Sequence, residues 1–164
     1  MYPDEIATVR AVLFAYPDVV LLCKTREDEI LALMGGGGEE GVHVQGGSGA
    51  SCGDRYAMAT DKDQKLAMAR SIRTAVKGGM QTLNRKEMDA VEAVFFKGMR
   101  HREASEYVGI STGYLSHVLD SAVSKMAEFC IPVYPLICRF REAMEKAKTD
   151  LLKQELQPQK KEGI

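Results

Sequence analysis

Apolar residues recur at helical spacing near the start of the chain. Between positions 4 and 16 they repeat every three or four residues, which predicts an amphipathic helix that Pro17 closes. A second apolar series follows Pro17-Asp18 and continues to Met34, where consecutive glycines stop it. Residues 1–34 are therefore expected to form an N-terminal helical region, folded as a helical hairpin or a bent helix. The apolar positions of its first part are Ile6, Val9, Val12, Leu13 and Tyr16.

Glycine dominates the following segment, with nine glycines from Gly35 to Gly53. Backbone entropy on this scale predicts a flexible linker over residues 35–59. A phosphate-binding loop would also need a Lys-Ser/Thr pair that opens a helix, and the glycine-rich sequence contains none. His43 and Cys52 lack the two further ligands of a zinc site. We therefore expect neither a cofactor nor a metal in this segment.

Two capped helices are predicted behind the linker. The first has Thr60 or Asp61 as its N-cap and is broken by Gly78-Gly79. The second begins after Asn84, because a Glu87 three residues later completes the signature of a capping box. Each helix carries an apolar stripe, so both are expected to pack into a common core.

One more helix is predicted near the end of the chain. Pro132 and Pro135 interrupt the pattern, after which an amphipathic and then strongly charged helix runs to about Leu156. The last residues, 157–164, are expected to be disordered. Because no convincing strand pattern competes with these helices, the predicted fold class is all-α.

Gly109 lies in the middle of residues 101–126, which are otherwise helical in pattern. Glycine is costly inside a helix, but it tolerates the positive φ of a tight turn. The small residues Ala104 and Ser105 precede it where two helices would touch, and the Ser111 hydroxyl is placed to cap a second helix. This arrangement predicts a helix-turn-helix. The apolar stripe of its second helix consists of Leu115, Val118, Ala122 and Met126.

The span from Leu83 to Met126 resembles region four of bacterial sigma factors, in which a capped helix leads into a helix-turn-helix. As a whole, the chain resembles the ArpU/RinA-like phage and prophage transcription regulators. The shared layout comprises Tyr16-Pro17, the glycine-rich loop, a connecting helix and the sigma-like module. Together, the pattern and the resemblance predict an N-terminal helical region (1–34), a linker (35–59), a helix-turn-helix DNA-binding domain (60–130), a C-terminal helix (131–156) and a tail (157–164).

The resemblance also implies sequence-specific binding to double-stranded DNA and a role in transcription. Residues at the start of a recognition helix reach base edges in the major groove, whereas nearby cations hold phosphates. With the helix at 111–126 as the recognition helix, the candidates for base edges are Ser111, Thr112, Gly113, Tyr114, Ser116 and His117. The candidates for phosphates are Arg100, His101, Arg102 and Lys125, with Lys97 as a further candidate.

The recognition helix departs from the sigma-type pattern in its charge. It has no Arg or Lys before Lys125 and it carries Asp120, so the common Arg–guanine contact is missing from its first two turns. Residues 61–127 hold 11 basic and 8 acidic side chains, against 4 and 9 in residues 1–60. Because this excess is modest, a homodimer, a higher homo-oligomer or RNA polymerase is expected to supply further affinity.

Composition indicates an ordinary globular chain. Of 164 residues, 45 % are hydrophobic and 27 % are charged, and no uninterrupted apolar run approaches the length of a membrane span. The four cysteines show no CxxC spacing, which favours thiols in a reducing compartment. We therefore expect a cytoplasmic protein with no membrane partner, and the resemblance to phage regulators implies that the cytoplasm is that of a bacterial host.

Three other classes of function are alternatives to DNA-binding regulation. The sequence contains no HExxH, GxSxG or phosphate-loop motif, so an enzyme is not expected. A phage packaging or assembly protein, such as a small terminase subunit, also combines a helix-turn-helix with oligomerising helices. An adaptor that binds RNA polymerase without touching DNA is the third alternative.

Overall fold

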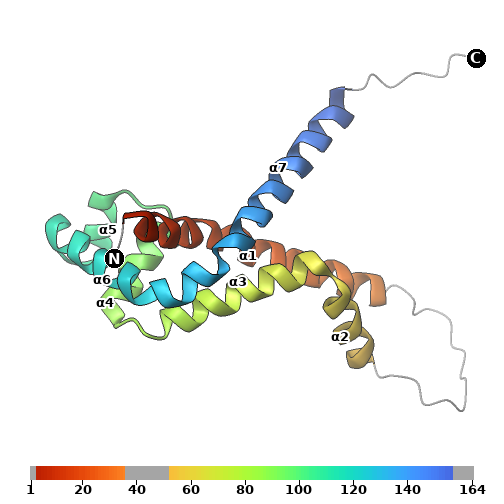
Figure 1. Ribbon diagram of the computed structural model, residues 1–164, viewed down its shortest axis with the longest axis horizontal. Coiled ribbons are helices and arrows are strands. Elements are labelled where there is room, and N and C mark those ends of the chain that lie inside the picture. The colour runs from red at the N-terminus through yellow and green to blue at the C-terminus, as the bar shows by residue number, and fades with distance from the viewer. Residues whose placement is uncertain (1–2, 36–51, 157–164) are drawn as a thin grey trace, which may run out of the picture.

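The computed structural model describes residues 3–35 and 52–156, and every regular element in these ranges is helical (Figure 1). The fold is therefore all-α. The predicted tail at 157–164 and most of the predicted linker, residues 36–51, lie outside the described residues. In chain order the elements are α1 (Pro3–Gly35), α2 (Cys52–Lys62), α3 (Gln64–Met80), α4 (Arg85–Val91), the π-helical turn η1 (Glu92–Phe96), α5 (His101–Val108), α6 (Thr112–Cys130), the 3₁₀ turn η2 (Ile131–Val133) and α7 (Tyr134–Leu156).

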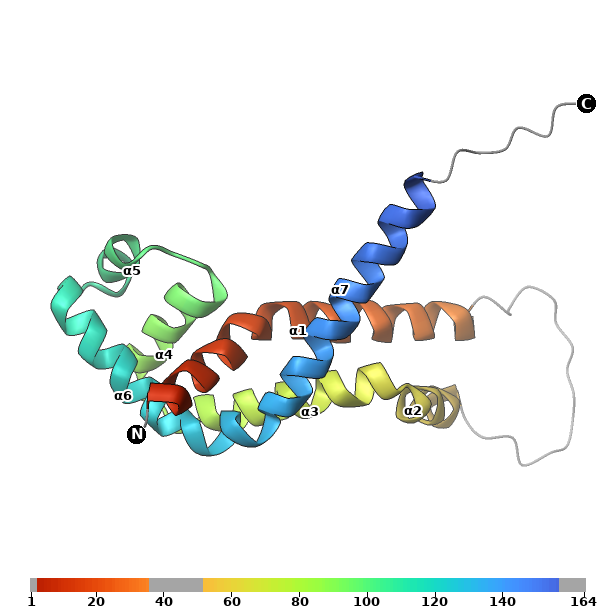
Figure 2. The same cartoon turned by 45° about the horizontal axis from the view of Figure 1, so that its top comes forward.

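The helices form an elongated body. α1 and α3 run side by side along its length, α4, α5 and α6 gather at one end, and α2 lies at the other (Figures 1 and 2). α7 starts on the body and then projects away from it (Figure 2). The three helices of the predicted helix-turn-helix thus occupy one end of the molecule, clear of α7.

The N-terminal region is one bent helix, so the predicted hairpin is wrong and the predicted alternative, a bent helix, is the form observed. α1 continues through Pro17, and its first turns are inclined to the rest, as expected where a proline removes a backbone hydrogen bond (Figure 2). Leu13 and Val19, on either side of the proline, are both fully buried. Burial of each such side chain contributes about 1.5–3 kcal/mol, so packing on both sides offsets the cost of the proline.

Helix α3 begins and ends differently from the prediction. Its N-cap is Asp63, whose side chain accepts a hydrogen bond from the backbone N–H of Leu66, and residues 52–59 of the predicted linker belong to α2. α3 also continues through Gly78-Gly79. A Cβ atom at Gly79 would lie 3.1 Å from the Met126 Cε atom, so glycine here allows α3 to approach α6 closely.

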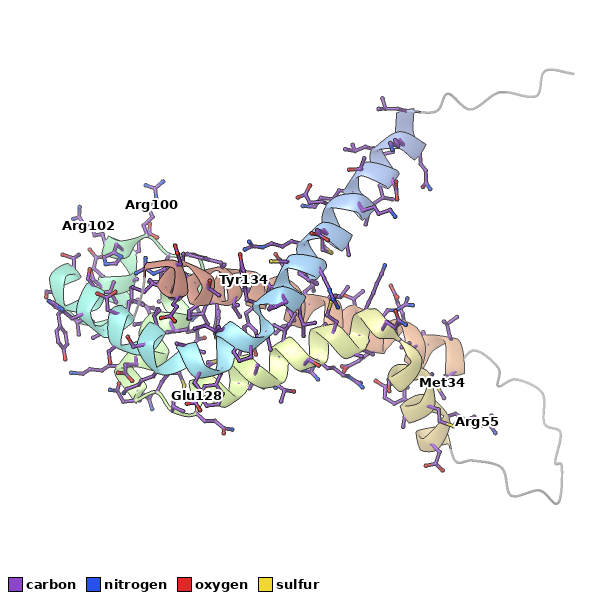
Figure 3. The ribbon with its side chains drawn as sticks, viewed as in Figure 1. Met34, Arg55, Arg100, Arg102, Glu128 and Tyr134 are labelled. Atoms are coloured by element: carbon purple, nitrogen blue, oxygen red, sulfur yellow. The ribbon has the colours of Figure 1, made fainter. Side chains whose placement is uncertain are left out.

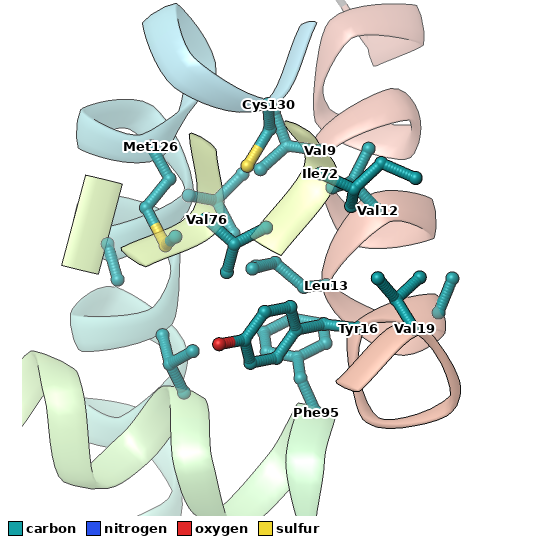
Figure 4. Packing of buried hydrophobic residues seen from close by; sticks show 14 of the residues in the cluster. Val9, Val12, Leu13, Tyr16, Val19, Ile72, Val76, Phe95, Met126 and Cys130 are labelled. Atoms are coloured by element: carbon teal, nitrogen blue, oxygen red, sulfur yellow. The ribbon is translucent and has the colours of Figure 1, made fainter. Parts of the chain in front are cut away.

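The core is formed where α1, α3 and α6 meet. Figure 4 shows Val9, Val12 and Leu13 of α1 packed with Ile72 and Val76 of α3. Aromatic residues close the side toward η1, where the rings of Phe14 and Phe95 meet edge to face with centroids 4.7 Å apart. The start of α7 joins this core through Ile137 and Phe140. The helix-turn-helix therefore shares its core with the N-terminal helix.

By length and composition alone, α1 could cross a membrane. The candidate span covers Asp4–Met34, and 39 % of its most apolar window is buried inside the fold. A core helix of a water-soluble protein has the same composition. The side of α1 that carries Val9, Val12 and Val19 is packed within the protein core.

Two of the cysteines are buried thiols. Burial raises the pKa of Cys23, and burial raises the pKa of Cys130 to about 12. Both side chains are therefore protonated core residues at neutral pH, in which form a thiol is a poor nucleophile.

A buried carboxylate joins α4 to α6. The Glu87 side chain is 5 % exposed, and its oxygens accept hydrogen bonds from Lys125 Nζ at 2.8 and 2.9 Å and from Ser121 Oγ at 2.7 Å. It also accepts from the backbone N–H of Asn84, which completes the predicted capping box. Burial by itself would raise the pKa of Glu87, but these hydrogen bonds and the Lys125 charge hold it below its ordinary value.

We expect Glu87→Gln to lower the free energy of unfolding by about 1–3 kcal/mol at pH 7, because Lys125 and Ser121 lose a charged acceptor. The pKa of Glu87 is lower in the folded protein than in the unfolded chain. Its contribution is therefore fully present above the unfolded pKa of about 4.3 and is lost as the pH falls through the folded value. Urea unfolding at several pH values measures both effects. The matched control is Glu106→Gln at an exposed position, and an equal loss in both variants would contradict the assignment.

Candidate nucleic-acid interface

The chain turns between α5 and α6 at Gly109. Its φ of 76° and ψ of 35° lie in the left-handed region, where glycine is favoured. The backbone N–H groups of Gly109 and Ile110 both donate to the Ser105 carbonyl oxygen, at 2.9 and 3.0 Å. The Ser111 hydroxyl then accepts from the Tyr114 N–H at 3.2 Å, and a new helix begins. The turn and its cap are those that the sequence predicts.

Small residues allow α5 and α6 to pack together behind this turn. Ala104 is fully buried, and the Ser105 hydroxyl donates to the Arg102 carbonyl oxygen at 2.7 Å. α4 contacts both helices, which completes a three-helix unit. The buried residues of α6 are the four predicted ones and three more: Leu115, Val118, Leu119, Ala122, Val123, Met126 and Cys130.

The opposite face of α6 is free at its start. All six residues predicted to reach base edges are exposed: Ser111, Thr112, Gly113, Tyr114, Ser116 and His117. The Ser116 hydroxyl lies 3.0 Å from His101 Nε2. His101, a predicted phosphate-binding residue, is therefore in contact with Ser116, a residue predicted to reach base edges. This link from α5 restricts the Ser116 side chain while leaving it accessible.

The start of α5 carries two exposed arginines. Arg100 and Arg102 extend away from the body at the helix-turn-helix end (Figure 3). Arg102 Nε lies 3.5 Å from a carboxylate oxygen of Glu106, with both side chains largely exposed. Because solvent weakens such an exposed pair, the guanidinium stays available to a phosphate.

Two predicted phosphate contacts already have partners inside the protein. Lys125 is held by Glu87, as described above. The Lys97 ammonium donates to the Tyr107 hydroxyl at 2.8 Å, lies 4.5 Å from the centre of that ring and is 3.6 Å from Glu92. These interactions hold Lys97 between η1 and α5. At the start of α5, the consecutive residues Arg100, His101 and Arg102 are all exposed. In contrast, Lys97 and Lys125 are engaged in interactions within the fold.

The basic excess in the middle of the sequence is partly neutralised by the fold. Arg70 and Arg73 of α3 lie 2.9 and 3.6 Å from the same carboxylate oxygen of Glu27 in α1. On α6, the acidic Asp120 lies 3.5 Å from Arg10 of α1. α1 thus supplies a cation beside the acidic residue of the candidate recognition helix.

Arg85 and Lys86 at the start of α4 border this face as well, and the sequence pattern did not identify them. The Arg85 side chain is 92 % exposed, and Lys86 Nζ lies 5.9 Å from the centre of the Tyr114 ring. Lys86, Tyr114 and His117 line one shallow hollow between α4 and α6. Only the packing of α4 against α6 shows that these cations lie near the start of α6.

Comparison of the chain with protein-family models, with curated proteins and with solved structures finds no match. The face combines a free helix start, small polar side chains and flanking arginines.

Two glycines provide a matched test of the turn. Nothing lies within 4 Å of a Cβ atom built on Gly109 or on Gly113. Substitution by alanine therefore changes only the conformational free energy of the backbone. We expect Gly109→Ala to destabilise the protein by about 1–2 kcal/mol because of its positive φ. Gly113 lies inside α6, so Gly113→Ala should stabilise it by about 0.5–1 kcal/mol. Urea unfolding measures both, and a stabilising Gly109→Ala would contradict the left-handed turn.

Proposed function

We propose that this protein is a sequence-specific DNA-binding transcription regulator of the phage or prophage type, acting in the cytoplasm of a bacterial host. The main support for this proposal is the first turns of α6. They follow a tight turn and expose their polar side chains to solvent. A helix presented in this way fits the major groove of duplex DNA. The resemblance to ArpU/RinA-like regulators supports the same function.

Base readout is assigned to the first two turns of α6. The hydroxyl groups of Thr112 and Ser116 act as donors or acceptors to several bases, and His117 hydrogen-bonds a guanine or a phosphate. Tyr114 packs on a sugar or on a thymine methyl group. Gly113 has no side chain, which allows the backbone of α6 to approach the groove closely.

Phosphate contacts are assigned to the cations that flank this helix. Arg100 and Arg102 project from the start of α5, and Arg85 and Lys86 lie at the start of α4. These two helix starts border α6, so their cations would hold the phosphates of the DNA strands beside the groove. The contacts would fix the position of the protein but would not select a sequence.

The charge of one copy predicts weak non-specific binding. Lys97 and Lys125 are engaged within the fold, and Asp120 opposes the phosphates. A plot of log affinity against log salt concentration falls with a slope of about 0.9 per phosphate contact. A protein with few phosphate contacts therefore shows a shallow slope. A second copy or RNA polymerase is therefore proposed to add affinity at the promoter.

The base-readout assignment predicts that Thr112→Ala/Ser116→Ala/His117→Ala lowers affinity for the preferred duplex by at least about tenfold, because lost base contacts cost about 1–3 kcal/mol each. The duplex is first selected from a random pool at fixed salt, and affinity is measured by fluorescence anisotropy. Ser71→Ala/Thr149→Ala, at exposed sites on α3 and α7, is the control.

The two possible failures of this experiment have different meanings. A protein that selects no duplex above the random pool would contradict DNA binding. A selected duplex that the triple variant binds as tightly as the wild type would contradict the base-readout assignment alone. Circular dichroism of the variant checks that α6 remains helical.

Asp120 is predicted to limit affinity. Asp120→Asn should tighten DNA binding by about fivefold at low salt, because it removes a negative charge beside the phosphates. The gain should shrink as salt screens the interaction. Glu128→Gln makes the same charge change near the far end of α6 (Figure 3) and should leave affinity unchanged. Equal gains in both variants would assign the effect to net charge alone.

The projecting helix α7 is also compatible with a packaging protein. Its exposed leucines favour self-association, which a packaging ring also requires. Size-exclusion chromatography with light scattering separates the two: a closed ring of about eight or more subunits favours packaging, and a monomer or dimer favours the regulator. A polymerase adaptor would show no binding to DNA on its own.

A further inference from the structure

The outer half of α7 exposes leucine side chains without support from the rest of the fold. Residues 144–156 are all exposed, and Leu151 and Leu152 are exposed by 60 % and 58 %. Figures 1 and 2 both show this part of the helix leaving the body. Two adjacent leucines on a projecting helix indicate a surface that another molecule covers.

The exposed leucines continue the face by which α7 is attached. Ile137 and Phe140 are buried in the core, and Met144 follows one turn later on the same side. Residues 148, 151, 152 and 155 extend this side at spacings of three and four. The face that packs within one copy thus continues to Lys148, which borders a hollow beside Asp18 of α1, and then runs beyond the body as Leu151, Leu152 and Glu155.

This face carries a positive charge on one side of the two leucines and a negative charge on the other. Lys148 precedes Leu151 by three residues, and Glu155 follows Leu152 by three. Each charge therefore lies about 5 Å along the helix axis from the midpoint between the leucines. Neither charge forms an ion pair within residues 3–35 and 52–156.

We propose that two copies of this chain associate through antiparallel α7 helices, with a two-fold axis at the midpoint of Leu151 and Leu152. Leu151 of each copy packs against Leu152 of the other. Lys148 of each copy then faces Glu155 of the other, which gives two ion pairs across the interface. Such a self-complementary patch is the requirement of a two-fold dimer.

Charge selects both the orientation and the partner. A parallel, in-register pair would place Lys148 opposite Lys148 and Glu155 opposite Glu155, and like charges repel. The reversal of charge about one point matches a second copy of the same helix. This association is independent of the DNA-binding proposal, because the outer part of α7 projects away from α4, α5 and the start of α6 (Figure 1).

Charge exchange tests the interface on the full-length protein by sedimentation velocity over a range of concentrations. The wild type should form a dimer. Lys148→Glu should weaken dimerisation by about tenfold or more, because a glutamate at position 148 of each copy would face Glu155 of the other. The combined Lys148→Glu/Glu155→Lys variant should restore it, because an antiparallel pair again joins opposite charges. Leu151→Asp/Leu152→Asp should be monomeric.

Lys146→Glu is the matched control, because it changes the net charge equally but lies about 200° round the helix from Lys148. It should dimerise as the wild type does, and circular dichroism checks helicity in every variant. A wild type that stays monomeric at every concentration overturns the proposal. So does a dimer that Lys148→Glu leaves intact, or a combined variant that fails to recover. DNA binding is measured separately, so either proposal can fail alone.

Discussion

The helix-turn-helix depends on one backbone constraint, the left-handed conformation at Gly109. Because glycine accepts a positive φ, two N–H groups turn back onto the Ser105 carbonyl oxygen and α5 ends. Ser111 then caps α6, which leaves in a new direction with its first turn exposed. A continuous helix through this point would bury or misdirect the polar residues that are proposed to read DNA.

Polar interactions inside the fold keep this turn at one end of a larger body. The buried Glu87 carboxylate holds α4 against α6 through Lys125 and Ser121. Glu27 gathers Arg70 and Arg73, which joins α1 to α3. These cations stabilise the fold and are thereby removed from the surface. The cost is a candidate DNA-binding face with few free positive charges, which explains why a second copy would add to its affinity.

In the proposed dimer, one face of α7 serves two purposes. Its first turns bury Ile137 and Phe140 in the core, and the same side then leaves the body with Leu151 and Leu152 uncovered. In the proposed dimer, a second copy covers these leucines and matches Lys148 with Glu155. Linking two helix-turn-helix units in this way would make the protein read two sites at once, as dimeric regulators do.

Local signals in the sequence were enough to predict the all-α fold, the Gly109 turn, the Asn84–Glu87 capping box and the buried stripe of α6. Each depends on residues within a few positions of one another, where backbone preference and helical period act directly. The continuity of α1 through Pro17, the close approach at Gly79 and the internal partners of Lys125 and Lys97 were decided by the tertiary structure. These features depend on which helices meet, and burial across those contacts outweighs local preference.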